Sequence, residues 1–261
     1  MKTIKYLILI ISFPLINSNL SATGKESPEN APEKTQKSHS DYRFNSFDFN
    51  VDFGINNYLN DGNFPDENGS IYAVRPWGSW YVALTGTQTT KIAGPLYLKL
   101  GAFVDWYNFK FLNENTRLTT NGQEVAFFEI NDPLINSQKS KLTLSYLNLK
   151  AVPTIYLGKN KHSSGGCGFL DWDNRPGAIR IGAGGYVGYR LDAYAKAQYK
   201  IEGDKEKERI RENYFTNNLR YGVRFELGVG SFDFFLNYDM NDLFVENRGP
   251  QLNPISFGLT L

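Results

Sequence analysis

Apolar and polar residues alternate without exception along residues 47–55, FDFNVDFGI. Successive side chains of a β-strand point to opposite faces, so this segment predicts a strand with one apolar and one polar face. A soluble sheet would turn the apolar face toward a core. A transmembrane barrel would turn that face toward lipid and the polar face toward a lumen.

Eight segments with this period follow one another, and no helical period of comparable length competes with them. Several exceed the 5–6 residues usual in globular proteins and reach the length of about 9–11 residues that a tilted strand needs to cross a bilayer. Single-chain outer-membrane barrels also require an even number of strands. The predicted strands are residues 44–58, 77–88, 96–111, 142–157, 178–194, 219–229, 232–244 and 254–261.

The connections between these segments alternate in length. Long connections at 59–76, 112–141 and 195–218 alternate with tight ones at 89–95 and 230–231. This alternation predicts an antiparallel, up-and-down barrel with its long loops on the outer side. The connection 158–177 is the exception, because it is long on the periplasmic side.

Three features of these segments call for local irregularity or exposure. Pro153 has no N–H for the ladder and predicts a bulge or a local break. The run 202–213 alternates in charge sign and predicts a solvated outer feature, either an extended hairpin or a short helix. Phe127 and Phe128 in the loop 112–141 predict an exposed contact surface, unless their segment extends the adjoining strands as a hairpin.

The first 43 residues differ from the rest in composition. Residues 1–22 combine Lys2 and Lys5, a short apolar run and small residues, which is typical of a cleaved export signal. A membrane-anchor helix is the alternative, but the run is too short and Pro14 interrupts it. Residues 23–43 are rich in Pro, Glu, Lys and Ser and predict a disordered periplasmic tether. Residues 44–261 then form the barrel domain.

Removal of residues 1–22 takes away two lysines and no acid, so the formal net charge falls from +1 to −1. This balance argues against nucleic acid as a partner, because phosphate binding requires a clear basic excess. Cys167 is the only cysteine, so an internal disulfide is impossible.

Acidic and basic residues are interleaved along the polar faces, with glycines between them. An eight-stranded barrel has an interior only wide enough for side chains to fill, and buried charges must be paired. We therefore expect a packed polar lumen with lipid outside. Its predicted charge network is Asp48, Asp52, Lys99, Asp105, Lys150, Arg180, Arg190, Asp192, Arg220, Arg224, Glu226, Asp233 and Asp239.

Three tryptophans, Trp77, Trp80 and Trp106, fall near the outer ends of the second and third predicted strands. Aromatic rings prefer the headgroup boundary of a membrane, so these residues predict an aromatic girdle.

The stretches SYLNLKAVPTIYLG (145–158), GGYVGYRLDA (184–193) and YGVRFELGVGSFDFFLNYDMNDLF (221–244) resemble the PorT-like outer-membrane β-barrel family. In that family a Tyr-Leu-x-Leu/Ile strand carries a central proline, and a glycine-rich strand with tyrosine pairs follows it. The resemblance implies an outer-membrane barrel of a Gram-negative cell and a link to protein secretion. It implies no catalytic residues.

Other chemistry has weak signals in the sequence. His162 is the only histidine outside the tether, and its neighbours Ser163 and Ser164 offer closeness in sequence without an orienting partner. The cluster Asp171–Asn174 lacks the remaining ligands of a Ca²⁺ loop. We therefore expect no enzymatic activity, no metal and no cofactor.

The sequence thus predicts an all-β, antiparallel, eight-stranded up-and-down transmembrane β-barrel that is monomeric in the cell outer membrane. Its partners would be outer-membrane lipid and a secretion-system or surface protein. It would act through its loops in cell-surface recognition or as an accessory to protein secretion. Two alternatives remain: a secreted soluble β-sandwich or lipocalin-like binding protein, and a lipid-modifying outer-membrane enzyme.

Overall fold

The computed structural model describes residues 45–66, 70–158, 179–201 and 204–261. The predicted signal (1–22) and tether (23–43) lie outside these residues, as does the connection 159–178. Within the described residues, the regular structure consists of β1 (Asn45–Leu59), β2 (Trp80–Ala93), β3 (Leu96–Lys110), β4 (Thr116–Thr120), β5 (Val125–Glu129), β6 (Ile135–Leu157), β7 (Ile179–Ile201), β8 (Asp204–Ile210), β9 (Leu219–Val229), β10 (Phe232–Asp239) and β11 (Asn253–Thr260).

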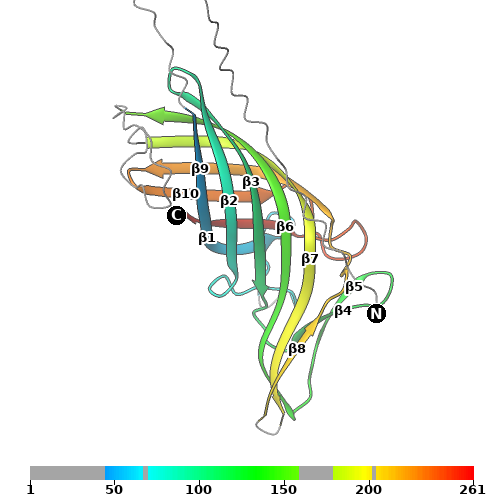
Figure 1. Ribbon diagram of the computed structural model, residues 1–261. Coiled ribbons are helices and arrows are strands. Elements are labelled where there is room, and N and C mark those ends of the chain that lie inside the picture. The colour runs from blue at the N-terminus through cyan, green and yellow to red at the C-terminus, as the bar shows by residue number, and fades with distance from the viewer. Residues whose placement is uncertain (1–44, 67–69, 159–178, 202–203) are drawn as a thin grey trace, which may run out of the picture. The chain divides into compact units, whose positions relative to one another are not determined.

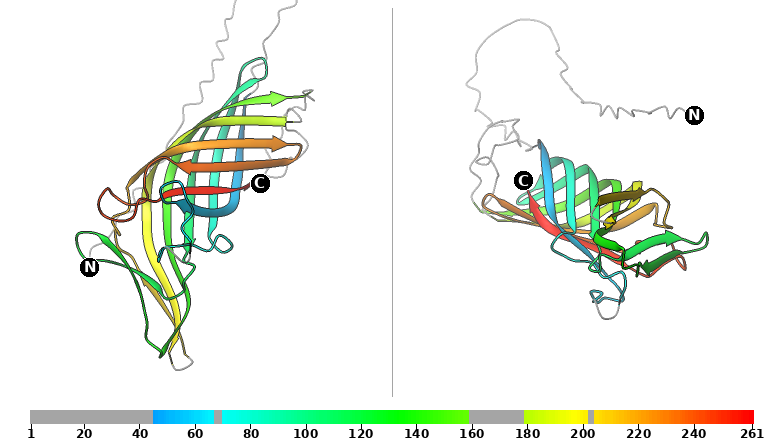
Figure 2. Two further views of the ribbon diagram at one scale, coloured as in Figure 1. Left: turned by 180° about the vertical axis from the view of Figure 1, so that it is seen from behind. Right: turned by 90° about the horizontal axis from the view of Figure 1, so that it is seen from below.

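Eight of these strands form a closed ring. The hydrogen-bonded order is β6-β3-β2-β1-β11-β10-β9-β7, and the β6–β7 ladder closes it (Figures 1 and 2). Every pair is antiparallel, and each ring strand lies beside its neighbours in the chain, so the predicted eight-stranded up-and-down barrel is confirmed. Tight turns at 94–95 and 230–231 mark the inner end, and the long connections within the described residues mark the outer end.

The ring closes where the first and last strands meet. Gly54 of β1 lies opposite Gly258 of β11, and a Cβ on either glycine would collide with the carbonyl of the residue beside its partner, Phe257 or Phe53. Both obstacles are backbone atoms, which cannot move without disturbing the ladder. The two glycines therefore allow the close approach of β1 and β11 that completes the ring.

We expect Gly54→Ala to lower the free energy of unfolding by about 1–3 kcal/mol, the usual cost of overpacking. The matched control is Gly86→Ala on β2, where an added Cβ meets only the Phe47 and Phe49 side chains. Urea unfolding in detergent, followed by gel migration without boiling, measures both variants. Equal losses for Gly54→Ala and Gly86→Ala would contradict this account of the seam.

β6 and β7 are longer than predicted. Each has 23 residues, and their outer halves rise past the ring as a hairpin, which we call the outer extension (135–145 and 192–201). β8 pairs with β7 along this part, so the hairpin alternative for residues 202–213 is confirmed. β4 and β5 form a separate two-stranded sheet (Figure 1).

The exterior of the ring is apolar. On β6, Leu147, Leu149, Ile155 and Leu157 are exposed, while the alternating Asn148 and Lys150 are buried. At about 3.3 Å per residue and a tilt of about 40°, residues 147–157 span about 25 Å, the height of a lipid-facing band. The lipocalin-like alternative is wrong for this chain, because the buried side of the wall is the polar one. No helix in the described ranges is long and apolar enough to cross a membrane.

A bulge changes which face of β7 points inward. Tyr146 pairs with Arg190 but the preceding Ser145 pairs with Asp192, so Leu191 is the extra residue. Beyond it, even-numbered side chains of β7 lie on the outer face. At Pro153 the β6–β7 ladder is interrupted with no change of register, so the predicted local break occurs there without a bulge.

Candidate functional site

Arg220 occupies the centre of the outer half of the lumen. Its Nη1 lies 3.0 Å from Asp105 Oδ2, and its Nη2 lies 3.7 Å from Asp239 Oδ1. The guanidinium also faces the rings of Tyr107, Tyr146 and Tyr186, with distances of 4.7 to 4.9 Å to their centroids. One cation thus balances two buried carboxylates and has aromatic faces around it, which favour a desolvated cation.

Glu226 is the corresponding centre of the inner half. Its carboxylate lies 2.8 Å from Lys99 Nζ, 3.0 Å from Lys150 Nζ and 2.8 Å from Arg224 Nε. Arg224 continues the network, because its Nη2 lies 2.9 Å from Asp52 and its Nη1 donates to Asn237 at 3.0 Å. These groups come from β1, β3, β6, β9 and β10, so the network joins opposite walls of the ring.

Five of the thirteen predicted network residues lie outside these two centres, and four of them are near the ends of the ring. Arg180 and Asp233 form their own ion pair at 2.9 Å near the inner end. Asp48 is exposed there, because β1 has passed beyond the packed lumen, and its carboxylate accepts a hydrogen bond from the Ser46 hydroxyl at 3.2 Å. Arg190 lies at the outer rim and donates to the neutral partners Asn213, Thr216 and Asn218.

The prediction for Asp192 is wrong. The β7 bulge places Asp192 on the outer face of the outer extension, where Arg209 and Arg211 lie 4.0 and 3.4 Å away. Strict alternation would have kept it in the lumen with Arg190, and one extra residue reversed its direction.

The sequence reasoning did not single out the tyrosines of the lumen. Tyr81 donates to Asp105 at 3.2 Å, and Tyr186 donates to Asp239. These tyrosines share the inward faces of their strands with the charged residues, so the alternation contained the signal that could have found them.

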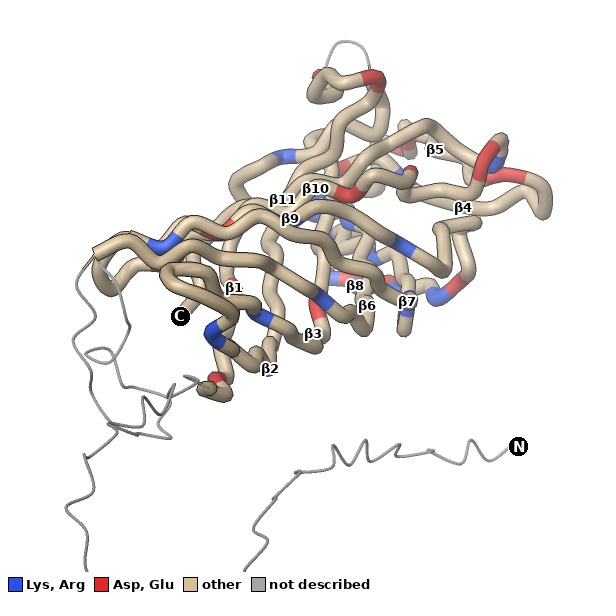
Figure 3. Tube along the Cα trace, turned by 90° about the horizontal axis from the view of Figure 1, so that it is seen from above, with Lys and Arg blue, Asp and Glu red and all other residues tan. Residues whose placement is uncertain are grey.

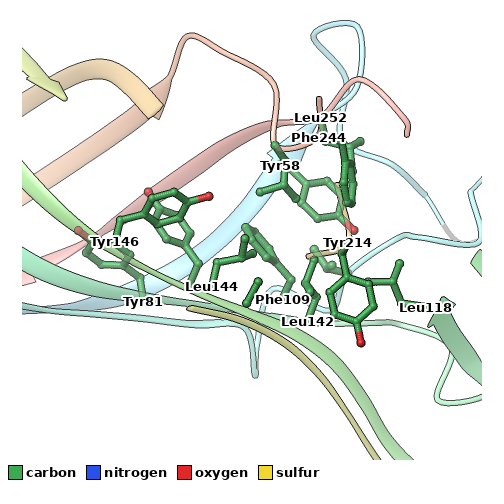
Figure 4. Packing of buried hydrophobic residues seen from close by; sticks show 14 of the residues in the cluster. Tyr58, Tyr81, Phe109, Leu118, Leu142, Leu144, Tyr146, Tyr214, Phe244 and Leu252 are labelled. Carbon is green, nitrogen blue, oxygen red and sulfur yellow. The ribbon is translucent and has the colours of Figure 1, made fainter. Parts of the chain in front are cut away.

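The outer mouth of the ring is covered by folded loops. The β4–β5 hairpin and the segments 71–75 and 243–250 form what we call the outer cap. Thr116 Oγ1 donates to the Ile71 carbonyl at 3.0 Å, and the Val125 N–H donates to the Arg248 carbonyl at 2.8 Å. Figure 4 shows the apolar cluster that joins the cap to the ring, in which Leu118 and Phe244 of the cap pack with Leu142, Tyr214 and Leu252.

The two phenylalanines predicted as an exposed contact have different environments. Phe127 packs on the rings of Tyr72, Phe111 and Phe244, with centroid distances of 5.6, 5.8 and 6.1 Å, so its predicted exposure is wrong. Phe128, the next residue on β5, points the other way and is 44% exposed. The hairpin alternates like any strand, which the composition of the loop did not reveal.

An open depression of about 450 Å³ lies on the outer cap. One side consists of residues 124–127 at the start of β5, and the other consists of Asn247, Gly249 and Pro250. The two sides of the depression are joined by a backbone hydrogen bond from Val125 to Arg248, which fixes its shape.

The three predicted girdle tryptophans all lie toward the outer end. Trp80 stacks on Phe53 with their ring centroids 5.2 Å apart, and Trp106 lies on the outward face of β3. Trp77 lies in the connection before β2 and is 77% exposed.

No group of three or more metal-binding side chains occurs among the residues that the structure describes. His162, Cys167 and the Asp171–Asn174 cluster lie outside those residues.

No protein-family model and no curated protein matches this chain. Among solved structures, the chain is similar to the crystal structure of Ail, the attachment invasion locus protein of Yersinia pestis, in complex with the heparin analogue sucrose octasulfate. The identity is 10% and the TM-score 0.28, over 82% of this chain and 97% of that one. At this TM-score, fold and location must follow from the chain's own geometry.

That geometry is a closed eight-stranded ladder, an apolar exterior of bilayer height and an ion-paired polar interior. These are the features of a protein that spans a membrane with strands. The described chain is therefore an outer-membrane β-barrel whose distinctive surfaces are its outer loops.

Proposed function

We propose that this barrel is a non-enzymatic recognition protein that presents the outer cap at the cell surface. The observation that carries the proposal is the contrast between the two ends of the lumen. Ion pairs and tyrosines fill the interior, whereas the outer end carries a folded cap with an exposed aromatic side chain and an open depression. A filled lumen favours a role in surface contact over a role in passage of solutes.

The partner that fits the outer cap is a protein segment. Phe128 offers an aromatic anchor, and aromatic side chains carry much of the affinity in protein interfaces. The adjoining depression is open and combines the apolar Val125 and Phe127 with small or polar residues such as Glu124, Asn247 and Gly249, which favours a peptide over an apolar small molecule. The resemblance to the PorT-like family supports a secretion-system component as that partner. The geometry of the outer cap is equally compatible with another protein at the cell surface.

Phe128→Asp tests the proposal. Because Phe128 is exposed, we expect this variant to keep the heat-modifiable folded form while losing the cellular activity of the parent. The measurements, in a strain that lacks the parent gene, are the secreted-protein profile and the adhesion of whole cells to protein-coated surfaces. Phe127→Asp is the structural control and should lose the folded form, because its ring packs on three others.

The outcomes separate the two forms of the proposal. A changed secretion profile supports the accessory role, and changed adhesion supports surface recognition. If Phe128→Asp behaves as the parent in both assays while deletion of the gene does not, the outer cap is not the functional surface.

A further inference from the structure

Four basic residues lie side by side on the outward face of the wall, at the level of the outer extension and on the strands beside it. In the strand registers, Lys110 lies opposite Lys141, Lys141 opposite Lys196, and Lys196 opposite Arg209. We call these residues of β3, β6, β7 and β8 the cation row. Figure 3 shows basic positions along the adjacent β6, β7 and β8. Like charges directly opposite one another destabilise a sheet, so this arrangement calls for a compensating anion.

The described residues supply few counter-charges. Lys110 has Glu114 at 3.7 Å, and Arg209 has Asp192 at 4.0 Å, which Arg211 also approaches. Within the described ranges, no carboxylate lies within 4.0 Å of Lys141 or Lys196. The Nζ of Lys141 instead donates to the Asn108 amide oxygen at 2.6 Å. The centre of the cation row thus has no acidic partner.

The mutual repulsion affects protonation in this part of the wall, which lies beyond the membrane-spanning residues. Partial burial lowers the pKa of Lys141 to about 8, and the positive charges of Lys139, Lys196 and Arg209 contribute to this shift in decreasing order. Burial, Lys110 and Lys196 also lower the pKa of Lys139. At neutral pH Lys141 remains mostly protonated, and a bound anion would stabilise that form.

The distance of the cation row from the lipid band indicates which kind of anion can reach it. Lys141 shares the outward face of β6 with Leu147 and lies six residues beyond it, about 15 Å along the barrel axis at the usual rise and tilt. The interfacial layer of a phospholipid bilayer is only about 5–8 Å thick on each side. Between the band and the cation row lies a polar row of Asn108, Thr143 and Tyr194. Thr143 is buried and its hydroxyl donates to Asn108, so the half-buried Asn108 and Tyr194 are the members that sugar hydroxyls would meet.

We propose that the cation row binds the phosphate groups of a phosphorylated glycolipid in the outer leaflet. The apolar band would contact its acyl chains, the polar row its sugars, and Lys141 and Lys196 its phosphates. The three levels lie on the same outward side of the wall, so one molecule lying along the wall reaches all three. This lipid contact is separate from the outer cap and does not rest on the proposed recognition function.

The test compares two double variants that remove the same charge. Lys141→Gln with Lys196→Gln removes the centre of the cation row. Lys200→Gln with Lys205→Gln removes another directly opposed pair of β7 and β8 lysines, farther from the membrane. The purified full chain in zwitterionic detergent is titrated with phosphorylated lipopolysaccharide, dephosphorylated lipopolysaccharide, phosphatidylglycerol and heparin, and binding is measured by calorimetry.

We expect the Lys141/Lys196 variant to weaken lipopolysaccharide binding about 25-fold, since a lysine beside an anionic membrane surface contributes about fivefold. The Lys200/Lys205 variant should change it less than about threefold, and dephosphorylation should weaken binding to the parent. Phosphatidylglycerol binding as tight as lipopolysaccharide binding would overturn the proposal, as would equal effects of both variants. Heparin binding that is tighter than lipopolysaccharide binding would assign the cation row to a soluble polyanion and would also overturn it. Gel migration without boiling verifies that both variants are folded.

Discussion

Replacement of Arg220 by methionine will lower the free energy of unfolding by about 3–5 kcal/mol. The change keeps a long side chain but removes the cation that balances Asp105 and Asp239, and breaking a buried ion pair from one side has this cost. Urea unfolding in detergent measures the effect, and the folded fraction on unboiled gels gives an independent value.

The cause can be separated from lost packing by a compensated variant. Arg220→Met combined with Asp105→Asn and Asp239→Asn leaves no uncompensated charge, so we expect it to recover most of the lost stability. Lys196→Met, on the outer face of the wall, is the control for removal of a cation elsewhere and should change stability little. A triple variant no more stable than Arg220→Met alone would show that packing around the guanidinium, not charge balance, holds this part of the lumen.

The second large effect concerns the exterior. Leu100 lies near the middle of the outward apolar residues of β3 and is half-exposed, so Leu100→Arg puts a cation into the bilayer midplane. We expect a loss of about 2–4 kcal/mol in the free energy of unfolding measured in lipid vesicles. The adjacent Lys99 is a cation at the same depth that the barrel tolerates, because it faces the lumen and lies 2.8 Å from Glu226.

Depth provides the matched control for this prediction. Leu147 of β6 lies at the outer edge of the same apolar band, where the same leucine-to-arginine change should cost about 0–1 kcal/mol. A soluble sheet would show no such dependence on height. Equal losses for Leu100→Arg and Leu147→Arg would therefore contradict the assignment of the band to lipid.

The two groups of outer residues have distinct consequences for function. The outer cap is folded onto the barrel by buried Leu118 and Val125, so truncation of the whole loop would expose the cluster beneath it. Single changes at Phe128 or in the cation row avoid that damage, because those side chains point away from the cluster. Functional tests on this protein are therefore best made at single outward residues.

The alternation of residue types by itself determined the eight ring strands and the two faces of most of them. Period-two patterning depends only on neighbours in the chain, and burial of one face makes it strict. It therefore separated Leu147 and Leu149 from Asn148 and Lys150. It also placed Asp105, Arg220 and Arg224 on inward faces before any contact was known.

Only the tertiary structure decided which of these residues meet and where the pattern is interrupted. Arg224 reaches Asp52, 172 positions earlier in the chain, because ring closure and strand register bring β9 and β1 to opposite sides of one narrow lumen. The bulge at Leu191 reversed Asp192, and packing of β5 on the barrel sheltered Phe127. The cation row likewise exists only because four strands pair in one particular register. Each of these depends on distant parts of the chain coming together, which a pattern of adjacent residues does not encode.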